Sequence, residues 1–309
     1  MAGPLEEGSA EAAELPELLS ETGLWVPGTR DPRPELLVFA PQYPLWSDGA
    51  EKRRWLELPP NTFIDARDAD DWVFPVGTRA WKEFSVDGRR VETRYLEALP
   101  DGSWRFATYV WEGDDARRAP EAGARLEDGY VVPSAIDCVA CHEGRRSPIL
   151  GFAALQLSGD RDPLAPHASS DPDAVVLAEL VGRGLVRGLS STVPRIAGDP
   201  IERAALGYLH GNCGGCHHDR GPLASLGLVL WRSVEADDRA SLFAPARFCD
   251  DAWDADHRVV AGAPERSVLA LRMGSRVPHQ QMPPIGTRRV DETARALVEQ
   301  WIRNERTEP

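Results

Sequence analysis

The sequence predicts an α+β protein, with an N-terminal antiparallel β-sandwich-like domain followed by mainly α-helical modules. Three observations predict this fold class. Between residues 78 and 111, runs rich in β-branched and aromatic residues are joined by Asp-Gly pairs. Two Cys-x-x-Cys-His motifs follow, at residues 138–142 and 213–217. Near the C-terminus, apolar residues after Asp291 recur with the period of an amphipathic helix.

Residues 1–35 are acidic and rich in Ala, Glu, Pro and Gly. This composition predicts a tether with little packed structure. Residues 1–20 have neither a basic start nor an apolar core, so they are not a signal peptide. Because the two Cys-x-x-Cys-His motifs are typical of exported proteins, we expect that a signal or lipoprotein leader was trimmed from the sequence. The alternative is a chain that stays inside the cell without covalent haem.

Strand-like runs dominate residues 36–132, which we expect to form one β-rich domain. The pairs Asp87-Gly88 and Asp101-Gly102 are strong hairpin signals, because both central residues of a tight turn need positive φ. Six tryptophans of this region are expected in its core: Trp46, Trp55, Trp72, Trp81, Trp104 and Trp111. A sugar-binding aromatic platform is the alternative, but no carboxylate pair placed for glycoside chemistry accompanies them.

Cys-x-x-Cys-His is the attachment motif of c-type haem. Two thiols three positions apart lie on one side of a helical turn, where they can bond both vinyl-derived carbons of one porphyrin, and the adjacent His ligates the iron. We therefore expect two covalently bound haem c groups. The expected attachment cysteines and axial histidines are Cys138, Cys141 and His142 for the first haem, and Cys213, Cys216 and His217 for the second. A zinc knuckle or a redox dithiol is the alternative for either motif.

Residues 133–199 are expected to form the first haem c module. Pro133 and Ser134 suit the start of a short helix that delivers the first motif. Asp171 and Pro172 are expected to open a second helix. Loops rich in Pro, Asp and Ser fill the rest of this module.

Residues 200–309 are expected to form a second domain, arranged like a class I cytochrome c. Residues 201–212 form a helix that leads into the second motif. The C-terminal helix crosses it, and we expect Tyr208 or Leu209 to meet Trp301 at the crossing.

Met282 lies on a Pro-stiffened loop between those two helices. We expect its thioether to be the sixth ligand of the second haem, because His/Met ligation raises the reduction potential. The alternative is a methionine that only packs.

The sixth ligand of the first haem stays open, since no methionine lies between His142 and the second motif. The position is vacant or is filled by a histidine: His167, His210, His218, His257 or His279. We keep His167 and Met273 as candidates. Met273 could reach the first haem only if the two haem modules were interlocked. Arginines near the motifs are candidates for pairing with haem propionates, with surface solvation as the alternative. They are Arg145, Arg146 and Arg272.

The chain of 309 residues carries a formal net charge of -14 and has no run of about 18 apolar residues. We therefore expect no transmembrane segment, no nucleic-acid partner, and redox partners with a basic docking patch. Cys249 is the fifth cysteine and is expected to be a buried thiol.

Several segments together resemble a bacterial dihaem c-type cytochrome family with a β-rich N-terminal domain. They are residues 43–50, 74–78 and 92–94, the two haem motifs, and residues 208–209, 272–273, 282–284 and 301–302. The resemblance covers nearly all of the chain after residue 36. It implies two covalent haems, export to the periplasm or another extracytoplasmic place, and electron transfer.

The leading functional hypothesis is an exported dihaem cytochrome that carries electrons between a donor and an acceptor protein. One alternative is a haem enzyme, peroxidase-like or small-ligand-binding, that uses an open first haem. Another is a cytochrome subunit that docks to a periplasmic dehydrogenase. We see no catalytic constellation apart from the haem motifs, which favours a carrier over an enzyme.

Overall fold

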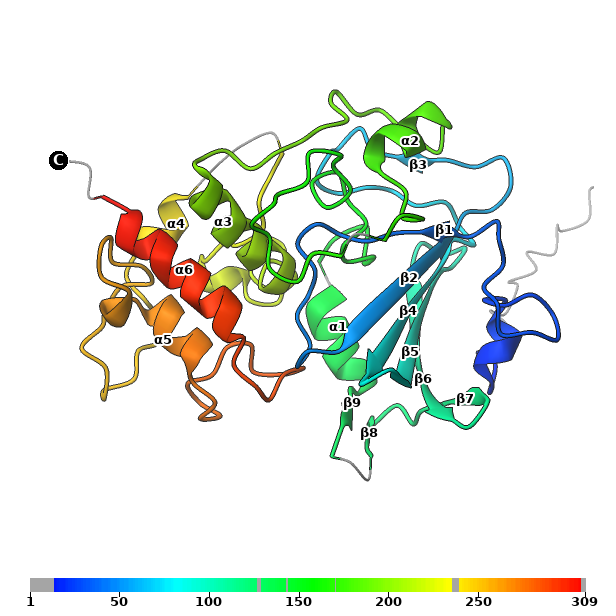
Figure 1. Ribbon diagram of the computed structural model, residues 1–309, viewed down its shortest axis with the longest axis horizontal. Coiled ribbons are helices and arrows are strands. Elements are labelled where there is room, and N and C mark those ends of the chain that lie inside the picture. Colours follow the sequence, from blue (N-terminus) through cyan, green and yellow to red (C-terminus); the bar gives the residue numbers. More distant parts are fainter. Residues whose placement is uncertain (1–13, 127–128, 143, 170, 235–238, 307–309) are drawn as a thin grey trace, which may run out of the picture.

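The computed structural model describes residues 14–126, 129–142, 144–169, 171–234 and 239–306. A sheet occupies one side of the molecule and the two longest helices occupy the other (Figure 1). Within the described ranges, every helix is too short or too polar to cross a lipid bilayer.

Six antiparallel strands form the main sheet, in the order β1-β2-β4-β5-β6-β7. Their bounds are Leu37–Val38 (β1), Glu51–Glu57 (β2), Arg79–Val86 (β4), Arg89–Ala98 (β5), Trp104–Glu112 (β6) and Asp115–Arg118 (β7). Asp87 and Gly88 join β4 to β5 with φ of 49° and 73°, so the first predicted hairpin is confirmed. The loop with Asp101 and Gly102 joins β5 to β6, which confirms the second hairpin.

Two short strand pairs complete the β structure. Ile64–Asp65 (β3) pairs in parallel with Val186–Arg187 (β10), and Ala124–Arg125 (β8) pairs with Val131–Val132 (β9). The described residues thus contain one large sheet and two ribbons, where a sandwich of two packed sheets was predicted. The sandwich is wrong because segments other than strands cover both faces of the sheet.

One face of the sheet, which we call the outer face, is covered by residues 14–36. Leu19, in a 3₁₀ helix at Leu19–Thr22 (η1), is fully buried there together with Leu24. They pack against Trp55, Trp81 and other aromatic residues of the sheet. Residues 14–35 were expected to belong to a tether, and burial of these leucines explains why they dock instead. The rest of the predicted tether, residues 1–13, lies outside the described residues.

The opposite face, which we call the α1 face, meets loops at one end and a helix at the other. Its apolar end, with Leu56, Ala80 and Leu96, packs against Trp72 and Phe152 from loops. Its other end faces Ala135–His142 (α1), which contacts β6 (Figure 1).

The helices are α1, Leu177–Gly182 (α2), Pro200–Asn212 (α3), Ala240–Phe243 (α4), Val268–Gly274 (α5) and Glu292–Asn304 (α6), with 3₁₀ turns at Ala224–Leu226 (η2) and Pro264–Arg266 (η3). Only α3 and α6, with 13 residues each, exceed eight residues among the described helices. The predicted series of mainly α-helical modules is therefore wrong. Pro and Gly break the segments between the motifs, and α2 begins at Leu177 instead of near Pro172.

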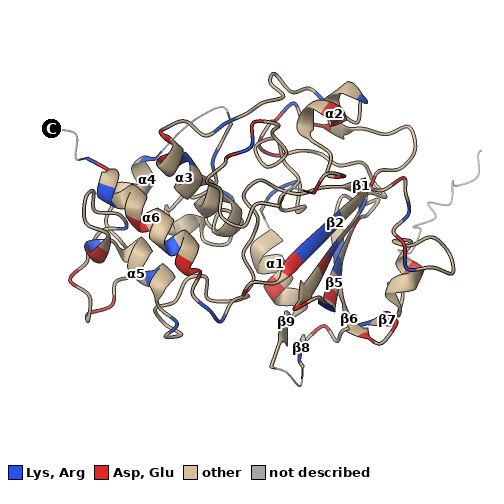
Figure 2. Cartoon of the chain, in the orientation of Figure 1, with Lys and Arg blue, Asp and Glu red and all other residues tan. Residues whose placement is uncertain are grey.

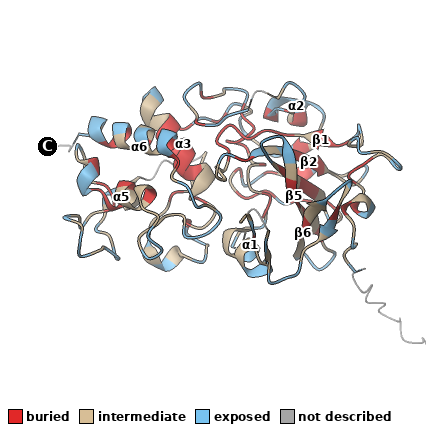
Figure 3. Ribbon diagram, turned by 60° about the horizontal axis from the view of Figure 1, so that its bottom comes forward, coloured by how far each residue is buried: buried red, intermediate tan, exposed pale blue. Residues whose placement is uncertain are grey.

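The predicted crossing of two helices is present: α3 packs against α6. Tyr208, Leu209 and Trp301 lie in one buried cluster there, as expected. Figure 3 shows buried residues along α3 and exposed ones on the outer side of α6.

Residues 41–46 connect the sheet to α3. Tyr43 is 2% exposed, and a Cβ built on Gly207 of α3 would lie 2.1 Å from its ring. The Trp46 amide donates to the Asn212 side-chain oxygen at 2.7 Å. The sheet and the C-terminal helices are thereby held against one another by the chain that leads into β2.

Candidate haem-attachment site

The first motif occupies α1, which is short and locally capped. The Asp137 carboxylate accepts from the Ser134 amide at 2.9 Å, and the Ser134 hydroxyl accepts from the Asp137 amide at 3.2 Å. This reciprocal arrangement stabilises the first turn of the helix. Cys138 and Cys141 are then separated by about one turn, and His142 is the last residue of the helix.

His142 is oriented as a metal-binding histidine would be. Its Nδ1 lies 2.5 Å from the Pro148 carbonyl oxygen, so Nδ1 carries the proton and donates, and Nε2 keeps a free lone pair. Its ring lies 5.4 Å from that of Phe106 on β6. Burial lowers the pKa of His142 to about 4. The imidazole is therefore neutral near pH 7, as ligation requires.

The second motif follows α3 directly. Asp199 caps this helix by accepting from the Ile201 amide at 2.8 Å. After the helix, a Cβ on Gly214 would lie 2.5 Å from the His210 carbonyl oxygen, so this motif position suits only glycine. The His217 amide donates to the Cys213 carbonyl at 2.9 Å, which closes one turn around the motif.

His217 is 8% exposed, and its Nδ1 is buried with no hydrogen-bond partner among the described residues. Burial, helped by the charges of Arg258 and Arg272, lowers its pKa to about 4. A neutral, buried imidazole with an unpaired nitrogen fits a metal ligand.

The two motifs touch each other. The Cys216 sulfur lies 3.7 Å from the Cys141 sulfur and 3.3 Å from the Ala140 carbonyl oxygen. Behind them, Gly144 has φ of 89°, and a Cβ there would lie 2.1 Å from the Arg220 carbonyl oxygen. The chain leaving the first motif is therefore packed directly on the chain leaving the second.

A buried carboxylate also joins the segments that follow the two motifs. Asp71, whose side chain is 0% exposed, accepts from the Arg146 amide at 2.9 Å and from the Arg220 guanidinium at 3.0 Å. Since an unpaired buried carboxylate is costly, this double contact favours the juxtaposed arrangement.

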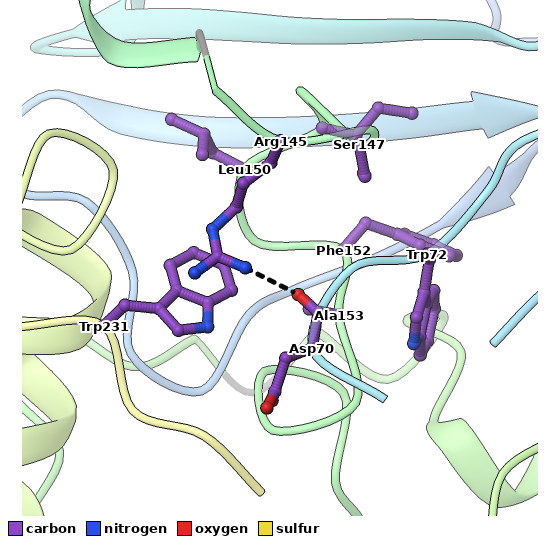
Figure 4. A pocket seen from close by; sticks show the side chains of 9 residues that line it. Asp70, Trp72, Arg145, Ser147, Leu150, Phe152, Ala153 and Trp231 are labelled. Atoms are coloured by element: carbon purple, nitrogen blue, oxygen red, sulfur yellow. Dashed lines mark hydrogen bonds between the residues drawn. The ribbon is translucent and has the colours of Figure 1, made fainter. Parts of the chain in front are cut away.

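A small pocket lies beside the junction (Figure 4). The Arg145 guanidinium sits 3.9 Å from the ring centroid of Trp231 and donates to the Asp70 carbonyl at 3.1 Å. Trp231 also contacts His210, at 4.5 Å between ring centroids. These aromatic and cationic groups fill the space between the second motif and the loops that cover the sheet.

The other predicted ligands have defined surroundings. The Met282 amide donates to the Arg272 carbonyl at 3.0 Å, and the charge of Arg272 acts on His217. The loop that carries Met282 therefore lies on the same side of the protein as the second motif. Ligation by Met282 stays a prediction. His167 contacts the Asp291 carboxylate through Nε2 at 2.9 Å, and Met273 packs in the core around α3 and α6. Neither contact brings these two residues to the first motif.

The arginines considered for propionates have protein partners. Arg146 contacts Asp71 and Asp68, and Arg272 donates to the Gln280 carbonyl at 3.2 Å. Cys249, predicted to be buried, is exposed in an acidic loop, so that prediction is wrong.

Sequence reasoning missed Pro148, Phe106 and a set of cations on the α1 face of the sheet. Pro148 offers only a backbone carbonyl, for which the residue type carries no signal. The cations could have been noticed, because Lys52 and Arg54 are two positions apart on one strand and so point to the same face.

No protein-family model, no curated protein and no solved structure matches this chain. Among the described residues, no three His, Cys, Asp or Glu side chains converge in a metal-binding arrangement.

Proposed function

We propose that this chain is an exported dihaem c-type cytochrome that carries electrons between redox partners. The observation that supports it best is the 3.7 Å contact between the Cys141 and Cys216 sulfurs. Two complete attachment motifs, distant in sequence, meet at these sulfurs, so groups bound to them would be immediate neighbours. A haem iron supplies a one-electron ferric/ferrous couple.

The residues of each motif suit distinct tasks. The cysteines, all without disulfide partners, would hold the porphyrins through thioethers. His142 would present Nε2 to one iron while the Pro148 carbonyl holds its ring in place. His217, with Met282 opposite, would ligate the other iron.

The charge of the protein supports a particular kind of partner. A net charge of -14 favours encounter with a basic docking patch on the donor or acceptor. Because c-type haem is attached outside the cytoplasm in bacteria, we place the protein in the periplasm or another extracytoplasmic location. A docked periplasmic dehydrogenase is one partner of this class.

A reductive titration of the full chain, matured in a host that attaches c-type haem, tests the proposal. We expect uptake of two electrons per chain from dithionite, with a c-type α band growing in step. Uptake of no electrons per chain would overturn the proposal.

A haem enzyme is the second candidate, and one observation favours it. The two candidates kept for the sixth ligand of the first haem contact other residues, His167 with Asp291 and Met273 in the C-terminal core. Carbon monoxide added to the reduced protein separates the two functions. A large spectral shift of one haem supports the enzyme, whereas an unchanged spectrum supports the carrier.

A further inference from the structure

The α1 face of the sheet carries a row of cations. In the strand register Arg54 on β2 is opposite Lys82 on β4, and Lys82 is opposite Arg94 on β5. Residues opposite one another in paired strands point to the same face, so the three side chains lie side by side. Lys52, two positions before Arg54, shares that face. Figure 2 shows basic residues along β2.

This row has too few negative charges. Glu92 is the carboxylate in the adjacent row of the same face, and it pairs with Arg94 at 2.5 Å. Lys52 donates to the Ala50 carbonyl at 2.9 Å, and its nearest other carboxylates, Asp48 and Asp291, already accept from backbone amides.

Arg54 and Lys82 are the unusual members of the row. Arg54 is 5% exposed, and within the described part of the chain no ion pair joins its guanidinium to a carboxylate. The Lys82 ammonium lies 4.9 Å from the Phe84 ring centroid and likewise forms no ion pair in the described ranges. Arg54 is buried and Lys82 is half-buried. Cations that are removed from water without a counter-charge are costly, so a protein keeps them where an anion binds.

The first motif lies over these cations. His142 contacts Phe106 on β6, and in the register Phe106 is opposite Leu96, two positions from Arg94 on the same face. The helix that carries the first motif, α1, also contacts β6 directly.

We propose that Arg54, Lys82 and Arg94, with Lys52 beside them, bind the propionate carboxylates of the haem attached to Cys138 and Cys141. This inference rests on the proposed function, because it needs haem at the first motif. Two carboxylates would offset two of the unpaired charges, and guanidinium groups match carboxylates well. The sheet then serves as the docking surface for the first haem.

Charge-removing variants of the full-length holoprotein test the proposal. We expect Lys82→Met and Arg54→Met to lower the potential of the first haem by about 59 mV, a tenfold shift toward the ferric form. The resonance Raman bending band of its propionates should shift too. Lys82→Arg keeps the charge, so it should leave the potential of the first haem and its propionate band close to those of the wild type. The first haem is the one that disappears on replacing Cys138 and Cys141 by alanine.

Arg53→Met is the matched control. Arg53 neighbours Arg54 in sequence but points to the outer face, over the Trp55 ring at 5.0 Å. The Arg53→Met substitution should shift the ferric/ferrous ratio of the first haem less than twofold and leave its propionate band unmoved. Loss of the first haem alone in Lys82→Met would also support the proposal.

Equal shifts in Arg53→Met and Lys82→Met, or an unmoved propionate band in Lys82→Met, would overturn it. If the wild-type protein nevertheless carries two haems, only the propionate site is refuted and the proposed function is retained. A wild-type protein without haem overturns both.

Discussion

The sulfur of Cys216 lies 3.7 Å from the sulfur of Cys141, although 75 positions separate the two residues in the chain. This contact depends on packing around it. Gly144 lies against the Arg220 backbone, and buried Asp71 accepts hydrogen bonds from the segments that follow both motifs. The two motifs, on α1 and after α3, thus meet in one place built by two distant parts of the chain.

Gly144→Ala should loosen this junction. Gly144 and Gly227 both have positive φ, so alanine costs about 1 kcal/mol of backbone strain at either position. Only at Gly144 would the new Cβ meet backbone, 2.1 Å from the Arg220 carbonyl, whereas nothing lies within 4 Å of Gly227. We expect Gly144→Ala to lower the free energy of urea unfolding by about 1–3 kcal/mol more than Gly227→Ala. Equal losses would show that the junction is not tightly packed.

Protein made without haem attachment should cross-link between its motifs. Diamide, which takes up the two electrons and two protons released by a pair of thiols, should join Cys141 to Cys216 because these sulfurs are already in contact. Peptide mass mapping identifies the bridge, and Cys216→Ser should abolish it. Predominant bridges within a motif, such as Cys138 to Cys141, would contradict the arrangement.

Acid should destabilise the protein through His210. This ring is 3% exposed and accepts the Arg232 amide at 3.0 Å through Nδ1, and burial lowers its pKa to about 3. In the unfolded chain its pKa is about 6.5, so below that pH the unfolded state binds a proton that the folded state does not. Stability is then lost as the pH falls from about 6.5 toward 3.

The size of this effect can be measured by urea unfolding at pH 7 and pH 5. We expect His210 to contribute a loss of about 2 kcal/mol over this interval. His210→Gln keeps a hydrogen-bond acceptor but cannot titrate. Between pH 7 and pH 5 its free energy of unfolding should therefore fall by about 2 kcal/mol less than that of the wild type. His279→Gln, at a largely exposed position, is the control and should follow the wild type. Parallel losses in all three proteins would refute the assignment.

Trp301→Ala should weaken the C-terminal half more than any surface change. Trp301 is 1% exposed and lies in the cluster that joins α3 to α6. Truncating such a residue costs about 3–5 kcal/mol. Phe248→Ala, at a position 66% exposed, should cost less than about 0.5 kcal/mol in the same urea assay. A small loss for Trp301→Ala would contradict the α3–α6 packing.

Local signals in the sequence predicted part of this fold. The Asp87-Gly88 turn and the stripe that buries Val298 and Trp301 depend on neighbouring residues, so both were predictable. The coverage of the sheet was not, because it depends on which distant segment buries which face. Leu19 and Leu24 in an acidic stretch, and Phe152 in a loop, provide that cover.

The candidate site was predictable to a similar degree. Each motif is local, so its cysteines and histidine were proposed from spacing alone, and their haem-binding role stays a prediction. Their meeting at Cys141 and Cys216 needs tertiary contacts that spacing does not encode. The cation row needs strand register as well: Arg54, Lys82 and Arg94 come from three strands, and only their pairing places them together.

The mass of the denatured, full-length protein, matured in a host that attaches c-type haem, tests the central claim most directly. We predict the polypeptide plus two covalently bound haems, falling to one haem when Cys138 and Cys141 are replaced by alanine and to the other when Cys213 and Cys216 are replaced. A mass equal to that of the polypeptide alone would contradict the account.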